Sequence, residues 1–146
     1  MSRELKHYTY DELYIGMKSE FEAAITEDTQ TEFRNLSGDI NPMHLSDDYA
    51  QKRGFQGRIA YGLSVASFYS TLVGVYLPGE HCLFQECSIQ WPRPVYIGDI
   101  LTISGEIVEK EDRFKRLTIK AAIKNQEGKK VSGAKLIVGV IGENED

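Results

Sequence analysis

The chain has 146 residues, a length typical of one domain, and we expect residues 1–146 to form a single domain. Its composition is 41% hydrophobic, 27% charged and 10% aromatic, which is typical of a globular protein and excludes collagen-like and disordered classes. The formal net charge of −5 argues against nucleic acid as a partner, because binding to phosphate backbones depends on clustered lysines and arginines.

The cysteines and the polar first residues indicate a cytoplasmic protein. Cys82 and Cys87 are five positions apart in a predicted strand, so their side chains should point to opposite faces and should not pair. Residues 1–7 are polar and do not resemble a signal peptide. The longest apolar stretch, residues 60–77, contains several hydroxyl residues, which favours a buried helix over a membrane span. We therefore expect no membrane partner.

The first third of the chain predicts a strand followed by a helix and a loop. Residues 19–26 alternate between polar and apolar, which is typical of a strand. Thr26 can cap a following helix, and Gly38 lies where a helix commonly ends in the left-handed conformation. Pro42 cannot donate a backbone hydrogen bond, so residues 39–44 should form a loop.

Two more helices are predicted before the chain turns to strands. Ser46 can cap a short helix over residues 47–53, and Gly54 and Gly57 bracket the loop that follows it. Residues 62–76 then form a helix that is apolar on nearly every side, so other elements should enclose it.

The second half of the chain predicts antiparallel strands. Residues 88–99 contain two prolines, which confine this segment to an edge or a bend, and Gly98 and Asp99 turn the chain. Three segments then carry alternating apolar residues: Leu101, Ile103 and Ile107; Leu117, Ile119, Ala121 and Ile123; and Ala134, Leu136, Val138 and Val140. This order predicts an α+β fold with an antiparallel sheet curled around one apolar helix. The exposed edges of such a sheet make a homodimer with a continued sheet plausible.

The loop at residues 39–44 carries the candidate catalytic residues Asp39 and His44. A carboxylate and an imidazole that face one water molecule can add water to a double bond, or remove it, by general acid–base catalysis. The alternative is structural: Asp39 and Asn41 would form turns with their own backbone, and His44 would cap a helix or fill a gap in the core.

Residues 33–44, FRNLSGDINPMH, followed by Ala50, resemble the hydratase motif of the MaoC-like family of (R)-specific enoyl-CoA hydratases. The resemblance continues through residues 57–70 and 94–99. It implies the hot-dog fold, in which a curved antiparallel sheet wraps a long central helix, usually in a homodimer or higher homo-oligomer with the site near the subunit interface. It also implies that Asp39 is the main base and that His44 helps to position the water and pass the proton.

The same resemblance gives four secondary site residues. Gly62 matches the oxyanion-hole glycine, whose backbone amide at a helix N-terminus would polarise the thioester carbonyl, although a glycine there could also serve close packing. Ser70 matches a helix serine near the site, but its hydroxyl could instead bond to a carbonyl of its own helix. Asn41 is expected to shape the loop. Tyr61 stands where the family commonly has histidine, which leaves the shape of the thioester site open.

The implied substrate is a trans-2-enoyl or (R)-3-hydroxyacyl thioester of CoA or acyl carrier protein. Adding water to an activated alkene needs no redox step, so we expect no cofactor, and the histidine and cysteine spacing predicts no metal site. Arg58 and Arg93 are candidates for contacts to the carrier's phosphates. His7 and His81 match nothing in the motif, and we expect each to have a surface or turn role.

Two other functions compete with the hydratase hypothesis. The first is a hot-dog thioesterase, but residues 62–77 contain no Asp or Glu that could serve as its carboxylate. The second is a non-catalytic acyl-binding module or partner subunit, but such a protein could lose Asp39 or His44 without loss of its fold, and both are present.

Overall fold

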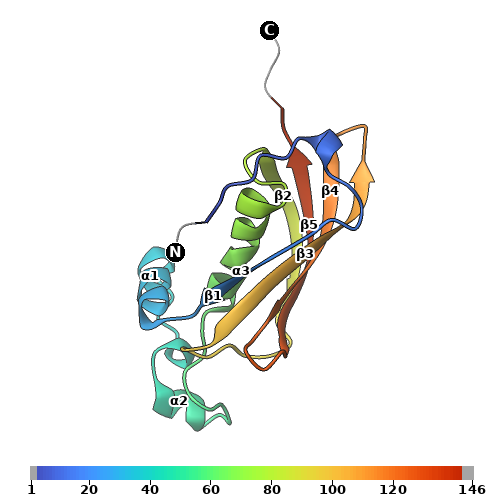
Figure 1. The fold of residues 1–146 in the computed structure, drawn as a ribbon. Helices are drawn as coiled ribbons and strands as arrows, with labels where there is room; N and C mark the ends of the chain where they lie inside the picture. Colours follow the sequence, from blue (N-terminus) through green and yellow to red (C-terminus); the bar gives the residue numbers. More distant parts are fainter. Residues whose placement is uncertain (1–2, 143–146) are drawn as a thin grey trace.

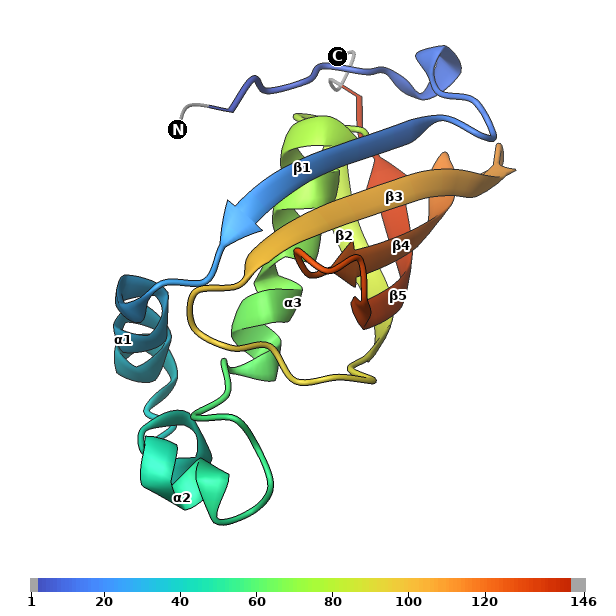
Figure 2. The same cartoon turned by 60° about the horizontal axis from the view of Figure 1, so that its bottom comes forward.

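The computed structural model describes residues 3–142, and its centre is a five-stranded antiparallel sheet that curves around one helix (Figures 1 and 2). The strand order is β1-β3-β4-β5-β2, so β1 and β2 are the edges. The elements are β1 (Lys18–Ala24), α1 (Glu27–Ser37), α2 (Asp47–Gln51), α3 (Gly62–Thr71), β2 (Cys82–Gln90), β3 (Ile100–Glu111), β4 (Arg116–Lys124) and β5 (Lys130–Val140).

The helix boundaries follow the capping residues predicted from the sequence. The Thr26 hydroxyl accepts a hydrogen bond from the backbone N–H of Thr29 at the start of α1, and Gly38 ends α1 in the left-handed conformation with φ of 74°. The Ser46 hydroxyl accepts in the same way from the N–H of Tyr49 at the start of α2. Local capping therefore sets where the loop between α1 and α2 begins and ends.

The apolar helix α3 lies on the concave side of the sheet, and it continues as a π-helix over Leu72–Tyr76 (Figure 2). Its buried side chains pack against the apolar faces of β3, β4 and β5 in one core cluster. The buried Tyr69 hydroxyl of α3 has a partner in this core, because it donates to Ser132 Oγ at 2.9 Å. None of the helices within residues 3–142 is long and apolar enough to span a bilayer.

The strand register places the predicted apolar positions on the face that contacts α3. Ile103 of β3 lies opposite Phe21 of β1 on one side and opposite Ile123 of β4 on the other. Ile119 of β4 in turn lies opposite Leu136 of β5, and all of these residues are buried. The α+β prediction, with a sheet curled around the apolar helix, is confirmed.

The prediction that Cys82 and Cys87 point to opposite faces is wrong. A β-bulge between Phe84 and Glu86 shifts the register, so that Cys82 lies opposite Val140 and Cys87 lies opposite Leu136. Partners across a strand pair point to the same face, and both cysteines therefore face the α3 side of the sheet. The two cysteines are nevertheless free, as expected.

The loop predicted over residues 39–44 contains one turn of 3₁₀-helix, Pro42–His44. Proline is compatible with the first position of a helix, because the N–H that it lacks would have no partner there. Asn41 precedes this turn, and its side-chain oxygen accepts a hydrogen bond from the Met43 N–H at 3.0 Å. The segment is therefore more ordered than a plain loop, and its order comes from its own side chains.

Candidate active site

His44 ends the 3₁₀ turn and is held by the backbone of a distant segment. Its Nδ1 lies 2.9 Å from the carbonyl oxygen of Ile59, and the Ile59 N–H donates to the Met43 carbonyl at 3.1 Å. A carbonyl oxygen only accepts hydrogen bonds, so Nδ1 carries the proton in this contact. Neutral His44 therefore keeps a lone pair on Nε2, which can accept a proton.

Asp39 lies two residues past the end of α1, and its side chain organises the start of the loop. Its Oδ1 accepts a hydrogen bond from the Asn41 N–H at 3.0 Å, and its own N–H donates to Ser37 Oγ at 3.2 Å. This is the turn expected if Asp39 has a structural role. Asp39 itself is solvent-exposed, so the turn does not prevent its carboxylate from meeting a ligand.

Tyr61 joins Asp39 to His44. The Tyr61 hydroxyl donates to the backbone carbonyl of Asp39 at 2.6 Å, and the Tyr61 ring lies against the His44 ring with centroids 4.1 Å apart. Phe33 packs on the same tyrosine ring at 4.9 Å, and Tyr61 is only 2% exposed. One buried side chain thus fixes the places of both candidate catalytic residues.

Burial raises the pKa of Tyr61, and the negative charge of Asp39 raises it further. The hydroxyl therefore stays protonated at neutral pH and remains a donor to the Asp39 carbonyl.

His44 lines a pocket of about 300 Å³ beside the N-terminus of α3. Gly62, the first residue of α3, lines the same pocket, and an N–H in the first helical turn has no acceptor within the helix. The other walls are mainly apolar side chains from Phe55, Ile59, Val65, Trp91 and Val95. The pocket therefore combines an imidazole, a free helix terminus and an apolar lining, while Asp39 is not among its lining residues.

Sequence reasoning missed Trp91, which contacts Gly62 directly. The indole N–H donates to the Gly62 carbonyl at 2.9 Å, and a Cβ at position 62 would come within 3.3 Å of the indole ring. Gly62 therefore allows close packing against Trp91, as considered from the sequence. It also lines the pocket. Trp91 and Gly62 are 29 positions apart, so no local sequence pattern predicts their contact.

The remaining candidates differ in their relation to the pocket. Ser70 lies on the exposed side of α3, about 12 Å further along the helix axis than Gly62, so the structure does not bring it to His44. Arg58 is engaged in ion pairs with Glu27 and Asp47. Arg93 lines the pocket and donates from Nη1 to the Lys130 carbonyl at 2.9 Å. Of the two arginines, only Arg93 is therefore placed at the pocket.

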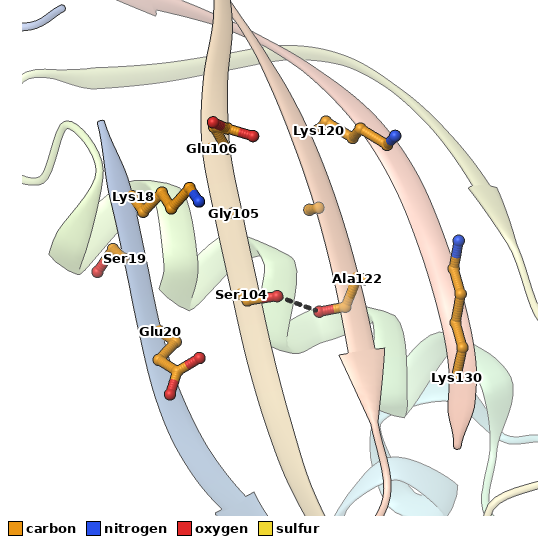
Figure 3. A pocket seen from close by; sticks show the side chains of 10 residues that line it. Lys18, Ser19, Glu20, Ser104, Gly105, Glu106, Lys120, Ala122 and Lys130 are labelled. Carbon is orange, nitrogen blue, oxygen red and sulfur yellow. Dashed lines mark hydrogen bonds between the residues drawn. The ribbon is translucent and has the colours of Figure 1, made fainter. Parts of the chain in front are cut away.

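A second depression, of about 570 Å³, lies on the face of the sheet that turns away from α3 (Figure 3). Its rim carries charges of both signs from Lys18, Glu20, Glu106, Lys120 and Lys130, and none of the predicted site residues lines it. This mixture of charges is typical of the solvated face of a sheet. No group of three or more His, Cys, Asp or Glu side chains within residues 3–142 is arranged to bind a metal.

Comparison with known proteins links this geometry to one family. The model of the MaoC like domain matches residues 12–129. An (R)-specific enoyl-CoA hydratase of Rhodospirillum rubrum is 35% identical over 109 residues, which cover 72% of this chain and 75% of the relative. A 3-hydroxybutyryl-CoA dehydratase of Methylorubrum extorquens is 32% identical over 109 residues, 75% of this chain and 69% of the relative. The structure of R-hydratase PhaJ1 from Pseudomonas aeruginosa superposes with a TM-score of 0.85 at 32% identity, covering 92% of this chain and 86% of that chain.

Proposed function

Because the chain belongs to the MaoC-like domain family, we propose that it is a hydro-lyase that interconverts trans-2-enoyl and (R)-3-hydroxyacyl thioesters. The observation that carries this proposal is the arrangement around Tyr61. Its hydroxyl bonds to the backbone carbonyl of Asp39, and its ring contacts His44, which lines the same pocket as Gly62. Two similar relatives are named as a hydratase and a dehydratase of acyl-CoA substrates, which supports the same reaction class.

The proposed reaction uses these residues as acid, base and oxyanion donor. Water is held between Asp39 and Nε2 of His44, and it loses a proton to this pair as its oxygen bonds to C3 of the enoyl group. Negative charge then develops on the thioester oxygen, which the Gly62 N–H and the N-terminus of α3 stabilise. The pair returns a proton to C2, so the sum is the addition of one water molecule, and the reverse steps are dehydration.

The apolar lining of the pocket supports a thioester substrate with an apolar acyl group. Phe55, Val65 and Trp91 offer an apolar surface to the acyl chain, and we assign Arg93 to the phosphates of CoA or of the acyl carrier protein arm. Asn41 stays a residue that shapes the loop, and Ser70 stays a secondary candidate for substrate contact. The free cysteines are compatible with a reducing compartment, and the cytoplasm is part of the same proposal.

Hydration of crotonyl-CoA tests the proposal directly. We expect the purified protein to remove the enoyl absorbance and to produce (R)-3-hydroxybutyryl-CoA, which a chiral analysis distinguishes from the (S) product. The competing thioesterase function is tested in parallel with butyryl-CoA, which has no double bond to hydrate. Steady release of free CoA from butyryl-CoA, without loss of enoyl absorbance from crotonyl-CoA, would overturn the proposal, and inertness toward both would favour a non-catalytic binding module.

We also propose that the protein forms a homodimer through the β2 edge. Strand β2 has β5 as its neighbour on one side only (Figure 1). This edge exposes large apolar side chains, Leu83 at 48% and the following Trp91 at 42%. Pairing two β2 strands would continue the sheet and cover both residues. Light scattering on a size-exclusion column should give twice the chain mass of 16.5 kDa, and a value at the chain mass itself would contradict the dimer.

A further inference from the structure

Gln30 is a buried polar residue that connects α1 to both segments holding the His44 ring. It is only 4% exposed. Its Nε2 lies 3.3 Å from the carbonyl oxygen of His44 and 3.4 Å from the carbonyl oxygen of Ile59. The amide thus links the 3₁₀ turn to the segment that precedes α3. The two carbonyls that it contacts belong to His44 and Ile59, which are 15 positions apart in the sequence.

The Ile59 carbonyl is shared between two donors. It accepts from Gln30 Nε2 and also from His44 Nδ1, the contact that puts the imidazole proton on Nδ1. A carbonyl oxygen has two lone pairs, so both bonds can exist at once. The direction in which this carbonyl points therefore decides which tautomer of His44 is favoured, and Gln30 is the side chain that holds it.

Burial of the Gln30 amide destabilises the fold, and packing alone does not explain why an amide stands there. Its Oε1 is buried and has no hydrogen-bond partner within residues 3–142. An unpaired buried acceptor destabilises a fold, whereas an apolar side chain of the same length would fill the space without this penalty. The amide is therefore useful for its donor atoms, and these are directed at the backbone around His44.

We propose that Gln30 is a positioning residue that keeps the His44 proton on Nδ1 and so presents the lone pair of Nε2 to the reacting water. The effect of Gln30 on catalysis rests on the proposed hydratase function. Its effect on the histidine tautomer does not, because the hydrogen bonds exist without substrate.

The experiment compares the wild type with Gln30→Met and with Gln51→Met as a matched control. Gln51 also donates its amide to a backbone carbonyl, that of Gln56, but it is exposed and lies outside this network. Long-range ¹H–¹⁵N spectra of uniformly labelled protein at about pH 8.5, above the ordinary pKa of histidine, report the tautomer of each ring. The chain has three histidines, and His44→Ala identifies the signal of interest.

We expect wild type and Gln51→Met to show His44 protonated on Nδ1, and Gln30→Met to shift its population toward the Nε2-protonated form. For crotonyl-CoA hydration, kcat of Gln30→Met should fall about 10-fold or more while KM changes little, because misorientation of an acid–base group affects the chemical step. The melting temperature should fall by less than about 4 °C, since the unpaired acceptor is removed together with the donors.

The outcomes separate this inference from the proposed function. An unchanged tautomer in Gln30→Met, or a wild-type His44 protonated on Nε2, would overturn the role of Gln30 even in an active enzyme. A shifted tautomer in a protein whose wild type does not hydrate enoyl thioesters would support the positioning role and reject the function. If Gln30→Met does not fold, Gln30→Leu removes the same donors from a shorter side chain and is judged by the same spectra.

Discussion

Replacing His44 with alanine should lower kcat/KM for crotonyl-CoA hydration by about 10²-fold or more, the size typical of a lost acid–base group. The ring lines the pocket, and its Nδ1 contact with the Ile59 carbonyl leaves Nε2 free to act on water. Alanine removes the proton acceptor and leaves the loop backbone in place. The measurement is the initial rate of loss of enoyl absorbance over a range of substrate concentrations.

His81→Ala is the matched control for this change. His81 lies 4.0 Å from the Glu80 carboxylate, just before β2 and outside the pocket, so its loss should leave the rate within about twofold of wild type. Circular dichroism should show both variants folded. A His44→Ala protein that hydrates crotonyl-CoA as fast as His81→Ala would remove His44 from the mechanism.

Asp39→Asn should cause a loss of similar size, about 10²-fold in kcat/KM, with little change in stability. Asparagine keeps an Oδ1 that can accept from the Asn41 N–H, and the Tyr61 hydroxyl bonds to the backbone carbonyl, which the change does not touch. The variant therefore removes the negative charge and the basic oxygen while it preserves the turn. Steady-state kinetics and thermal melting are the two measurements.

The Tyr61 hydroxyl provides a second readout for Asp39→Asn. Because burial and the Asp39 charge both raise the pKa of Tyr61, removing the charge should lower that pKa, while burial still keeps it above the ordinary value. Asp28→Asn, a change of the same chemistry at an exposed position in α1, should alter neither the rate nor this pKa. Equal hydration rates in both asparagine variants would show that Asp39 serves the turn alone.

Most of the fold could be predicted because it depends on short-range rules. Thr26 and Gly38 mark the ends of α1 through their own backbone and side-chain preferences, and Ser46 does so for α2. Alternation of apolar residues indicated which face of β3, β4 and β5 is buried. The Cys82 and Cys87 prediction failed because a single inserted residue in β2 reverses the alternation, and nothing in the local pattern indicates that bulge.

The site was only partly predictable, because its parts come together by long-range packing. Asp39 and His44 stand on one loop, and their chemistry and motif single them out. The residues that hold them do not share that loop: Tyr61 reaches Asp39 across 22 positions, and Gln30 reaches Ile59 across 29. Neither the tyrosine just before α3 nor the glutamine within α1 has a sequence feature that reveals such contacts, so their roles emerge only from the folded chain.

The contact between Trp91 and Gly62 gives the protein a built-in optical probe. Trp91 is the chain's single tryptophan, and its indole donates to the residue that opens α3 in the pocket wall. Its fluorescence emission therefore originates at the site itself, and we expect it to change when a molecule displaces solvent there. Ligand affinity and association rates can be followed in rapid-mixing experiments without a label, even in variants such as His44→Ala whose turnover is expected to be slow.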